Sequence, residues 1–212
     1  MTETRAQGLR ARKRRSTRQA IERGAVDLAL KHGYDHVTVE MICDVAVISQ
    51  RTFFNYAGSK EGAVLGIELP LPGEALRAAY VAGRGGSPLE DLLQTLAAAL
   101  TESGSADPEL FRKRRQIIEA NPVLAIKEFA RMEEAQNTVA SMVRERLQAE
   151  AGMENGHEEE SLELNEDARM TVVLSFALMH FCAGEWTAGG ASVDLGPILA
   201  EGATRAHRII SA

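Results

Sequence analysis

Polar side chains suited to DNA recognition are interleaved with aromatic ones between residues 49 and 60. On a helix that starts after Ser49, Phe53 can turn towards a core while the polar side chains face outwards. Gln, Arg and Asn carry donors and acceptors that match adenine and guanine edges. Hydroxyl and ammonium groups suit phosphate oxygens. The candidates for base edges are Gln50, Arg51 and Asn55, and those for phosphates are Thr52, Tyr56 and Lys60.

Three short helices would be needed to position these side chains, and the sequence predicts them within residues 11–57. The first has apolar residues at helical spacing and ends at Gly33. Thr38 and Ser49 are suitable N-caps for the second and third. Because only a few residues separate those two helices, we expect them to cross steeply as a helix-turn-helix. In that motif the N-terminal end of the later helix meets base edges in the major groove.

The charge distribution supports an anionic partner for the first part of the chain. The net charge is −6 over 212 residues, but residues 1–60 hold eleven Lys/Arg against six Asp/Glu. The segment RARKRRSTR (10–18) precedes the first apolar helical pattern, and we expect it to be a basic arm along phosphates or in the minor groove. A solvated charge run is the alternative. Arg14 and Arg15 are its candidate contacts.

The remainder of the chain also reads as helical. Ser-Pro, Asp-Pro and Asn-Pro pairs at 87, 107 and 121 indicate helix starts, because Pro is favoured at the first helical position. We therefore predict an all-α fold of about nine helices. It comprises a helix-turn-helix domain over residues 1–58 and a second helical domain over residues 59–212.

Several functional classes lack their signatures. The sequence has no Gly-rich phosphate loop, nucleophile elbow or paired carboxylates, so we expect no enzyme and no catalytic residue. His157 with its acidic neighbours, and His180 with Cys182 and Glu185, lack zinc spacing, so no metal or cofactor is predicted. Two distant cysteines and no signal-like or membrane-spanning run favour a cytoplasmic protein without membrane contact.

The run TVEMICDVAVISQRTFFNYAGSKEGAVL (38–65) resembles the DNA-binding domain of the tetracycline-repressor (TetR) family. This sequence departs from the family pattern at three positions. Val47 stands where the family usually has the turn Gly, Ala57 where it usually has Phe, and Cys43 where it usually has Ala. A β-branched residue is strained at positive φ, so Val47 puts the angle of the turn in question. The positions in register with the family are Thr38, Ile42, Ala46, Ser49, Thr52, Phe53, Tyr56, Ser59 and Lys60.

The resemblance implies a homodimeric regulator, usually a repressor that a small ligand releases from a palindromic operator in double-stranded DNA. It places base contacts on the third helix. More loosely, residues 108–147 resemble an actinobacterial branch assigned acyl-CoA-like ligands. The resemblance to the TetR family also assigns ligand binding and dimerisation to the helical domain over residues 59–212, and it implies phosphate contacts at Thr38, Ser49, Thr52, Tyr56 and Lys60.

The candidate ligand residues combine positive charge with adaptable apolar side chains. The alternative is that the arginines form a solvated face and that the apolar residues are ordinary core. The set consists of Arg112, Arg115, Phe129, Met132, Phe176, Met179, His180 and Trp186.

Candidate dimer residues lie on the last two predicted helices, at about 164–187 and 195–210. The first of these is apolar on nearly every side, which suits burial against both its own domain and a second copy; a fully intramolecular core helix is the alternative. The residues are Val172, Val173, Phe181, Leu199, Ala203, Ala206 and Ile210.

Two other functions remain open from sequence. A DNA-binding regulator controlled by a protein partner or by its abundance would need no small ligand. A helical small-molecule-binding protein would carry its basic N-terminus only as a charged surface. The match over residues 38–60 favours the DNA-binding function over the second of these.

Overall fold

Ten α-helices and one 3₁₀ helix account for the regular structure of the described residues, among which there is no strand. The computed structural model describes residues 2–67, 69–83, 85–152, 158–189 and 194–211, without the side chains of 2–11, 158–161 and 210. The all-α prediction is confirmed, with ten helices instead of about nine. They are α1 (Thr2–His32), η1 (Tyr34–His36), α2 (Val39–Ala46), α3 (Gln50–Ala57), α4 (Lys60–Leu65), α5 (Glu74–Val81), α6 (Pro88–Ser103), α7 (Pro108–Ala120), α8 (Pro122–Glu150), α9 (Glu158–Ala188) and α10 (Leu195–Ile210).

The chain divides into two compact units that are not continuous in sequence. The N-terminal unit comprises residues 1–69 and 109–129, and the C-terminal unit comprises residues 70–108 and 130–212. Nearly all of α7 and the start of α8 thus pack with the first four helices. The predicted boundary at residue 58 separates DNA binding from ligand binding and dimerisation, and this division of function stays a prediction.

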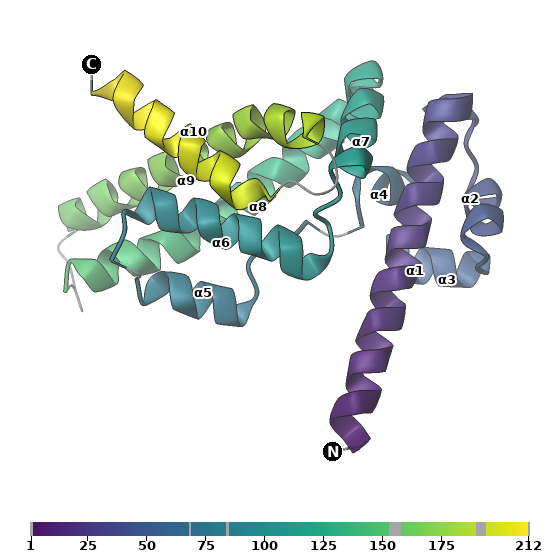
Figure 1. The fold of residues 1–212 in the computed structure, drawn as a ribbon, viewed down its shortest axis with the longest axis horizontal. Helices are drawn as coiled ribbons and strands as arrows, with labels where there is room; N and C mark the ends of the chain where they lie inside the picture. Colours follow the sequence, from purple (N-terminus) through teal and green to yellow (C-terminus); the bar gives the residue numbers. More distant parts are fainter. Residues whose placement is uncertain (1, 68, 84, 153–157, 190–193, 212) are drawn as a thin grey trace. The chain divides into compact units, whose positions relative to one another are not determined.

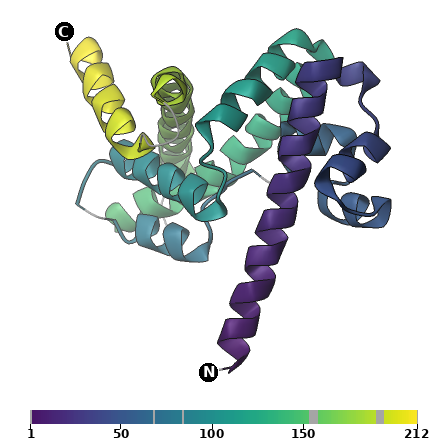
Figure 2. The same ribbon diagram turned by 45° about the vertical axis from the view of Figure 1, so that its right-hand side comes forward.

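The core of the N-terminal unit is built around Phe53 of α3. Phe53 has no exposed surface and packs with fully buried Ile21 of α1, Ile42 of α2 and Val64 of α4. Burying a Phe or Ile side chain stabilises a fold by about 1.5–3 kcal/mol. Figures 1 and 2 show α2 and α3 against the C-terminal half of α1, as this shared core requires.

The first helix is longer than the sequence indicated. It begins at Thr2 and ends at His32, where Gly33 at φ 83° provides the predicted stop. The basic segment 10–18 is therefore part of α1 and not an arm that precedes it. A run of basic residues is compatible with an extended arm and also with a helix, because Arg and Lys are good helix formers. The charges of that segment therefore did not distinguish the two.

A buried carboxylate fastens α7 within the N-terminal unit. Glu22 of α1 is 7% exposed and accepts a 2.9 Å hydrogen bond from the Ile67 backbone amide. Arg114 of α7 donates from Nη2 to Glu22 Oε2 at 3.3 Å and from Nε to the Val64 carbonyl at 2.7 Å. Ile117 of α7 enters the same core.

The C-terminal unit has a separate core formed by α5, α6, α8 and α9. Its fully or nearly fully buried members include Tyr80, Leu92, Val139, Val143 and Val172. The helix α10 packs on α6 and α9, and Figure 1 shows it crossing α9. None of the helices among the described residues has the length and apolar character needed to cross a bilayer.

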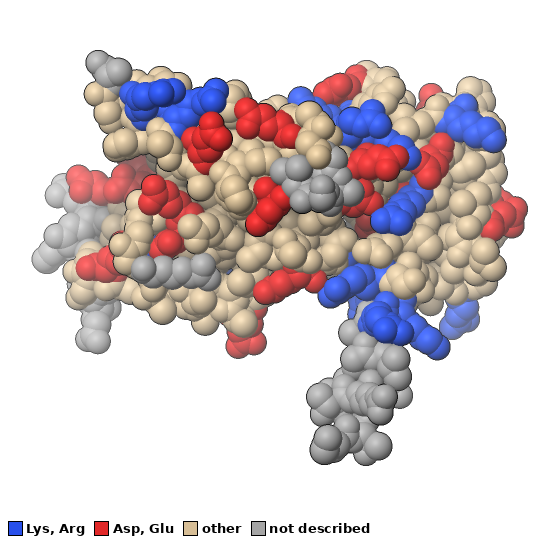
Figure 3. Space-filling view, viewed as in Figure 1, with Lys and Arg blue, Asp and Glu red and all other residues tan. Residues whose placement is uncertain are grey.

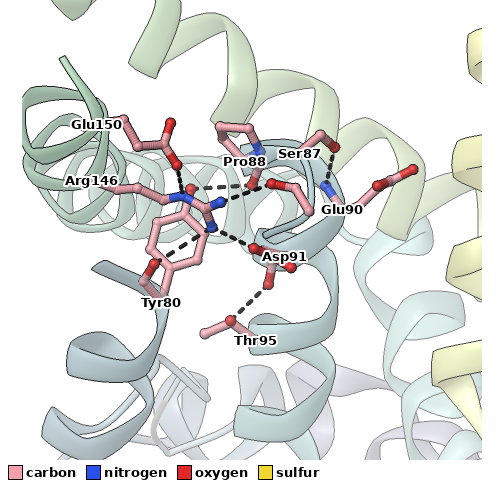
Figure 4. Close-up of polar contacts among 9 residues, drawn as sticks. Tyr80, Ser87, Pro88, Glu90, Asp91, Thr95, Arg146 and Glu150 are labelled. Atoms are coloured by element: carbon pink, nitrogen blue, oxygen red, sulfur yellow. Dashed lines mark hydrogen bonds and ion pairs between the residues drawn. The ribbon is translucent and has the colours of Figure 1, made fainter. Parts of the chain in front are cut away.

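An arginine inside this unit is surrounded by hydrogen-bond acceptors (Figure 4). Arg146 of α8 pairs with Asp91 of α6, and its Nη2 donates to the Gly86 carbonyl at 3.0 Å. Its guanidinium carbon lies 5.0 Å from the centroid of the Tyr80 ring. Ser87 caps α6 beside this cluster by accepting from the Glu90 amide at 3.2 Å, as predicted from the Ser-Pro pair.

Candidate nucleic-acid interface

The turn between α2 and α3 is formed by a helix-ending motif with an unusual residue. The Ile48 amide donates to the Cys43 carbonyl at 3.0 Å, and the Val47 amide donates to the Asp44 carbonyl at 3.3 Å. This is the hydrogen-bond pattern of a Schellman motif, which normally has Gly in the left-handed position. Here Val47 occupies that position at φ 54° and ψ 51°, a conformation that is unfavourable for a β-branched residue.

Predicted capping residues fix the start of each helix in the motif. The Thr38 hydroxyl oxygen accepts from the Met41 amide at 3.3 Å, and Ser49 Oγ accepts from the Thr52 amide at 3.1 Å. Ser49 and Thr52 also share a 2.9 Å hydroxyl hydrogen bond. These hydroxyls thus hold the backbone in place. Because a phosphate oxygen only accepts hydrogen bonds, one hydroxyl proton of the Ser49–Thr52 pair remains for it.

The helix α3 separates its apolar and polar faces as the sequence predicted. Phe53 is buried in the core, whereas Gln50, Arg51 and Asn55 are exposed. Gln50 is the first residue of the helix, at the end that meets base edges when such a helix enters a major groove. The arrangement therefore offers amide and guanidinium groups to an external partner.

Two residues of the candidate phosphate set have positions that the sequence did not reveal. Tyr56 is half-buried against the N-terminal core. Lys60 Nζ donates to the Tyr34 carbonyl at 3.0 Å and lies 4.2 Å from the centroid of the Tyr34 ring. Lys60 therefore also joins α4 to η1, and its remaining N–H groups are the ones that a phosphate could use.

Positive charge also follows the described part of α1. The side chains of Arg12, Lys13, Arg14 and Arg15 are exposed, and Figure 3 shows blue side chains gathered on α1 where its described side chains begin. Such a cluster of positive charge suits the phosphate backbone, whose attraction for Lys and Arg is independent of sequence.

Two exposed residues beside this surface were not among the sequence candidates. Phe54 of α3 is 52% exposed and meets the buried Phe53 ring edge-to-face, with centroids 5.4 Å apart. Glu40 of α2 is exposed and accepts a 2.9 Å hydrogen bond from Gln50 Nε2. Apolar side chains can contact a thymine methyl group and carboxylates can accept from cytosine. The sequence signal that could have identified Phe54 is its spacing of three and four residues from Arg51 and Gln50 on the same helix. For Glu40 it is the position in the first turn after the Thr38 cap.

The candidate ligand residues are divided between the two compact units. Arg112, Arg115 and Phe129 belong to the N-terminal unit, whereas Met132, Phe176, Met179, His180 and Trp186 belong to the C-terminal unit. Arg115 Nε donates to Glu119 at 2.8 Å, and Phe129 is 71% exposed. Phe176 and Met179 pack on the C-terminal core, Trp186 is buried and His180 is exposed. Phe176, Met179 and Trp186 therefore fit the alternative of ordinary core residues, and Arg115, paired with Glu119, fits that of a solvated arginine face. The exposed Phe129 and His180 do not lie in a core.

A hollow of about 420 Å³ lies between α6 and the start of α10. None of the predicted ligand residues lines it. Its lining is mixed, because α6 contributes both alanines and polar side chains to it. The residues are Gln94, Ala97, Ala98, Thr101, Glu102, Asp194 and Gly196.

The candidate dimer residues fall into two groups. Val172, Leu199 and Ala203 are at most 7% exposed within the single chain, so they form its own core and offer no surface to a second copy. Val173 and Phe181 are 51% and 56% exposed, and Ala206 is half-buried. The side chain of Ile210 lies outside the described residues.

The possible metal ligands considered from sequence are only partly described. His157 lies outside the described residues. Cys182 is buried and donates from Sγ to the Ile198 carbonyl at 3.6 Å, whereas His180 on the same helix is exposed. Within the described part of the chain, no group of His, Cys, Asp and Glu side chains could hold a metal ion.

Comparison with known proteins identifies similar sequences. The profile of a family described as bacterial regulatory proteins, tetR family, matches residues 21–65. The HTH-type transcriptional regulator TcmR of Streptomyces glaucescens is 32% identical over 141 residues, which cover 64% of this chain and 62% of TcmR. The matched region thus spans less than two thirds of that regulator's length.

Comparison with solved structures also returned matches to regulators. Thermus thermophilus FadR, described as a TetR-family transcriptional repressor in complex with lauroyl-CoA, has a TM-score of 0.45 at 25% identity, covering 88% of this chain and 91% of FadR. A putative TetR-family regulator from Mesorhizobium loti MAFF303099 has a TM-score of 0.36 at 18% identity, covering 80% of this chain and 98% of that protein.

Proposed function

Because the chain belongs to the tetR family of bacterial regulatory proteins, we propose that it binds double-stranded DNA through α3 and represses transcription. The observation that carries this proposal is the division of α3 between a buried Phe53 and the exposed Gln50, Arg51 and Asn55. A helix anchored on one face and rich in base-reading groups on the other is what major-groove readout requires. The exposed arginines and lysine of α1 would add affinity through phosphates.

The proposed regulator acts as a homodimer on a palindromic operator. Two copies of α3 would then read two half-sites about one helical turn apart. The surface that supports dimerisation is a stripe along α9 that consists of Met170, Val173, Ala177 and Phe181, all exposed in the single chain. The opposite side of α9 buries Val172, Ser175 and Trp186 in its own unit, so α9 has a second face free to pack on a partner.

Release by a small molecule is the proposed mode of control. A ligand releases DNA only if it binds better to a form of the dimer whose recognition helices do not fit both half-sites. The division of the predicted ligand residues between two units gives no support to one chemical class, so the proposal specifies an effector without an acyl-CoA assignment.

Fluorescence anisotropy tests the DNA-binding function directly. The purified protein is titrated onto the duplex from immediately upstream of its own gene and onto a shuffled duplex, each at two salt concentrations. We expect tight binding that prefers the native duplex and weakens steeply with salt. Lack of binding to either duplex at low salt would overturn the proposal, and equal binding to both would place the operator elsewhere.

A further inference from the structure

A hydrogen bond joins the first turns of the two helices of the helix-turn-helix. Gln50 Nε2 donates to Glu40 Oε1 at 2.9 Å, from the first residue of α3 to the second residue of α2. Both side chains are exposed, so the contact is not explained by packing in the core. Glu40 thus holds a residue that lies at the end of α3 proposed to enter the groove.

The chemistry of this contact determines how the Gln50 amide is oriented. An ionised carboxylate only accepts hydrogen bonds, so it pairs with the amide nitrogen and repels the amide oxygen. A Gln side chain without such a partner can rotate its amide by half a turn and exchange the two groups. With Glu40 in place, Gln50 keeps its oxygen and its second N–H for another partner.

Glu40 is itself fixed at the start of α2. Its carboxylate interacts first with its own backbone N–H, then with the Thr38 hydroxyl, and with Gln50. These interactions lower the pKa of Glu40 below its ordinary value, so the group is ionised at neutral pH. The carboxylate is therefore an acceptor held in a defined place and not a mobile surface charge.

We propose that Glu40 is a positioning residue for base recognition, which holds Gln50 so that it reads adenine. The exposed oxygen and N–H of Gln50 match the N6 donor and N7 acceptor of adenine in the major groove. This inference rests on the proposed function of α3, and it assigns Glu40 a part in specificity at a cost in general affinity.

The charge of Glu40 gives the inference a distinctive signature. A carboxylate close to DNA repels phosphates and lowers affinity for every sequence. Removing it should therefore strengthen binding to random DNA while weakening the preference for adenine. A residue with only a structural role would lower both affinities together.

The experiment begins with selection of duplexes from a random pool by the wild-type protein. The position at which Gln50→Ala loses its adenine preference is then the position that Gln50 reads. Anisotropy titrations measure the affinity of Glu40→Ala and Glu40→Gln for the selected duplex, for the same duplex with that adenine replaced, and for a shuffled duplex. Asp44→Ala is the matched control, because Asp44 is an exposed acid on the same helix.

We expect Glu40→Ala to lower the adenine preference about tenfold and to raise affinity for shuffled DNA about two- to fivefold. Glu40→Gln should keep part of the preference, because its carbonyl can still accept from Gln50. Asp44→Ala should raise general affinity similarly and leave the preference intact. The double variant Glu40→Ala/Gln50→Ala should show no further loss of preference beyond that of Gln50→Ala.

Two results would overturn the inference while leaving DNA binding in place. One is an unchanged adenine preference in Glu40→Ala. The other is a loss of preference at a different base pair, independent of Gln50, which would show that Glu40 reads cytosine itself. Failure of the wild-type protein to enrich any sequence or bind either duplex at low salt would instead overturn the proposed function, and this inference with it.

Discussion

Arg146 Nη1 lies 2.7 Å from Asp91 Oδ2, in an ion pair whose two side chains are only 1% and 6% exposed. The same guanidinium also bonds Glu150 at 2.7 Å and the Gly86 carbonyl at 3.0 Å. The pair thus joins α6 and α8 to the loop before α6. Because a buried charge is tolerated only when it is paired and hydrogen-bonded, these partners make up one unit of the fold.

Removing one member of this pair should destabilise the protein strongly. Asp91→Ala leaves the Arg146 charge buried, and we expect a loss of about 3–5 kcal/mol in the free energy of unfolding. Urea unfolding followed by circular dichroism measures it. Glu150→Gln is the control. Because the Glu150 side chain is 47% exposed, this variant should lose less than about 1 kcal/mol in the free energy of unfolding. Similar losses in the two variants would show that Arg146 is not buried as described.

The elements of the fold were largely predictable because their ends have local signals. Thr38, Ser49 and Ser87 cap helices through contacts three residues away, and such contacts depend only on neighbouring residues. Arg146 was not predictable in this way. It lies three and four residues beyond Val143 and Met142 in a stripe of buried positions, but its partner Asp91 is distant in sequence, and an arginine is normally exposed.

The turn of the helix-turn-helix contains a removable source of strain. Val47 is 89% exposed and has φ 54°, so glycine would relieve the steric cost of the left-handed conformation with little loss of packing. We expect Val47→Gly to raise the free energy of unfolding by about 1 kcal/mol in urea denaturation. The stability of Val47→Ala should fall between that of the wild type and that of Val47→Gly, because alanine removes the β-branch but keeps Cβ. A less stable Val47→Gly would mean that Val47 is held there by favourable contacts.

Glu61 should make stability depend on pH in the acid range. Its own backbone amide, with Ser59, Tyr34 and Lys127, lowers the pKa of Glu61 from 4.5 to about 2. The unfolded chain therefore takes up this proton first as the pH falls, and the stabilisation is present above pH 4.5 and lost between about 4.5 and 2. Glu61→Gln should lose about 1–2 kcal/mol at pH 7, after allowance for partial exposure.

The measurement for Glu61 is the difference in unfolding free energy between wild type and Glu61→Gln at pH 7, 5, 4 and 3. That difference should be constant down to about pH 5 and then shrink. Glu119→Gln serves as control, because Glu119 is 64% exposed beside Arg115 and should change stability by less than about 0.5 kcal/mol. A difference that stays constant to pH 3 would contradict the low pKa.

The candidate sites were less predictable than the helices, for a reason visible on α9. Val172 and Val173 are adjacent in sequence and equally apolar, but one is 1% exposed and the other 51%. When both sides of a helix are apolar, its periodicity does not indicate which side faces its own core. On α3 the two sides differ in chemistry, so the exposed residues could be predicted there.

The exposed stripe of α9 gives a prediction for assembly. Phe181→Glu places a charge where Phe181, 56% exposed in the single chain, would be covered by a partner. We expect the dissociation constant of the dimer to rise about 100-fold or more, seen as a shift to monomer in size-exclusion chromatography with light scattering. Ile126→Glu, at a 71% exposed apolar position on α8, should remain dimeric. An unaltered dimer in Phe181→Glu would exclude this stripe as the interface.

The contacts of Lys60 decide how phosphate binding is best tested. Lys60→Ala would remove the bond to the Tyr34 carbonyl and the contact with the Tyr34 ring together with any phosphate contact, so reduced DNA binding could come from a loosened fold. Tyr56→Phe avoids this difficulty. It keeps the half-buried ring against the core and removes only the hydroxyl.

Base and phosphate contacts on α3 should respond differently to substitution. Tyr56→Phe should weaken binding to selected and shuffled duplexes alike, by about three- to tenfold, because a phosphate contact carries no sequence information. Arg51→Ala should cost about 1–3 kcal/mol on the selected duplex and relax the preference at one base pair if the exposed Arg51 reads guanine as proposed. Anisotropy titrations measure the ratio of variant to wild-type affinity on the selected duplex and on the shuffled duplex. Equal losses on both duplexes for Arg51→Ala would assign that arginine to the phosphates.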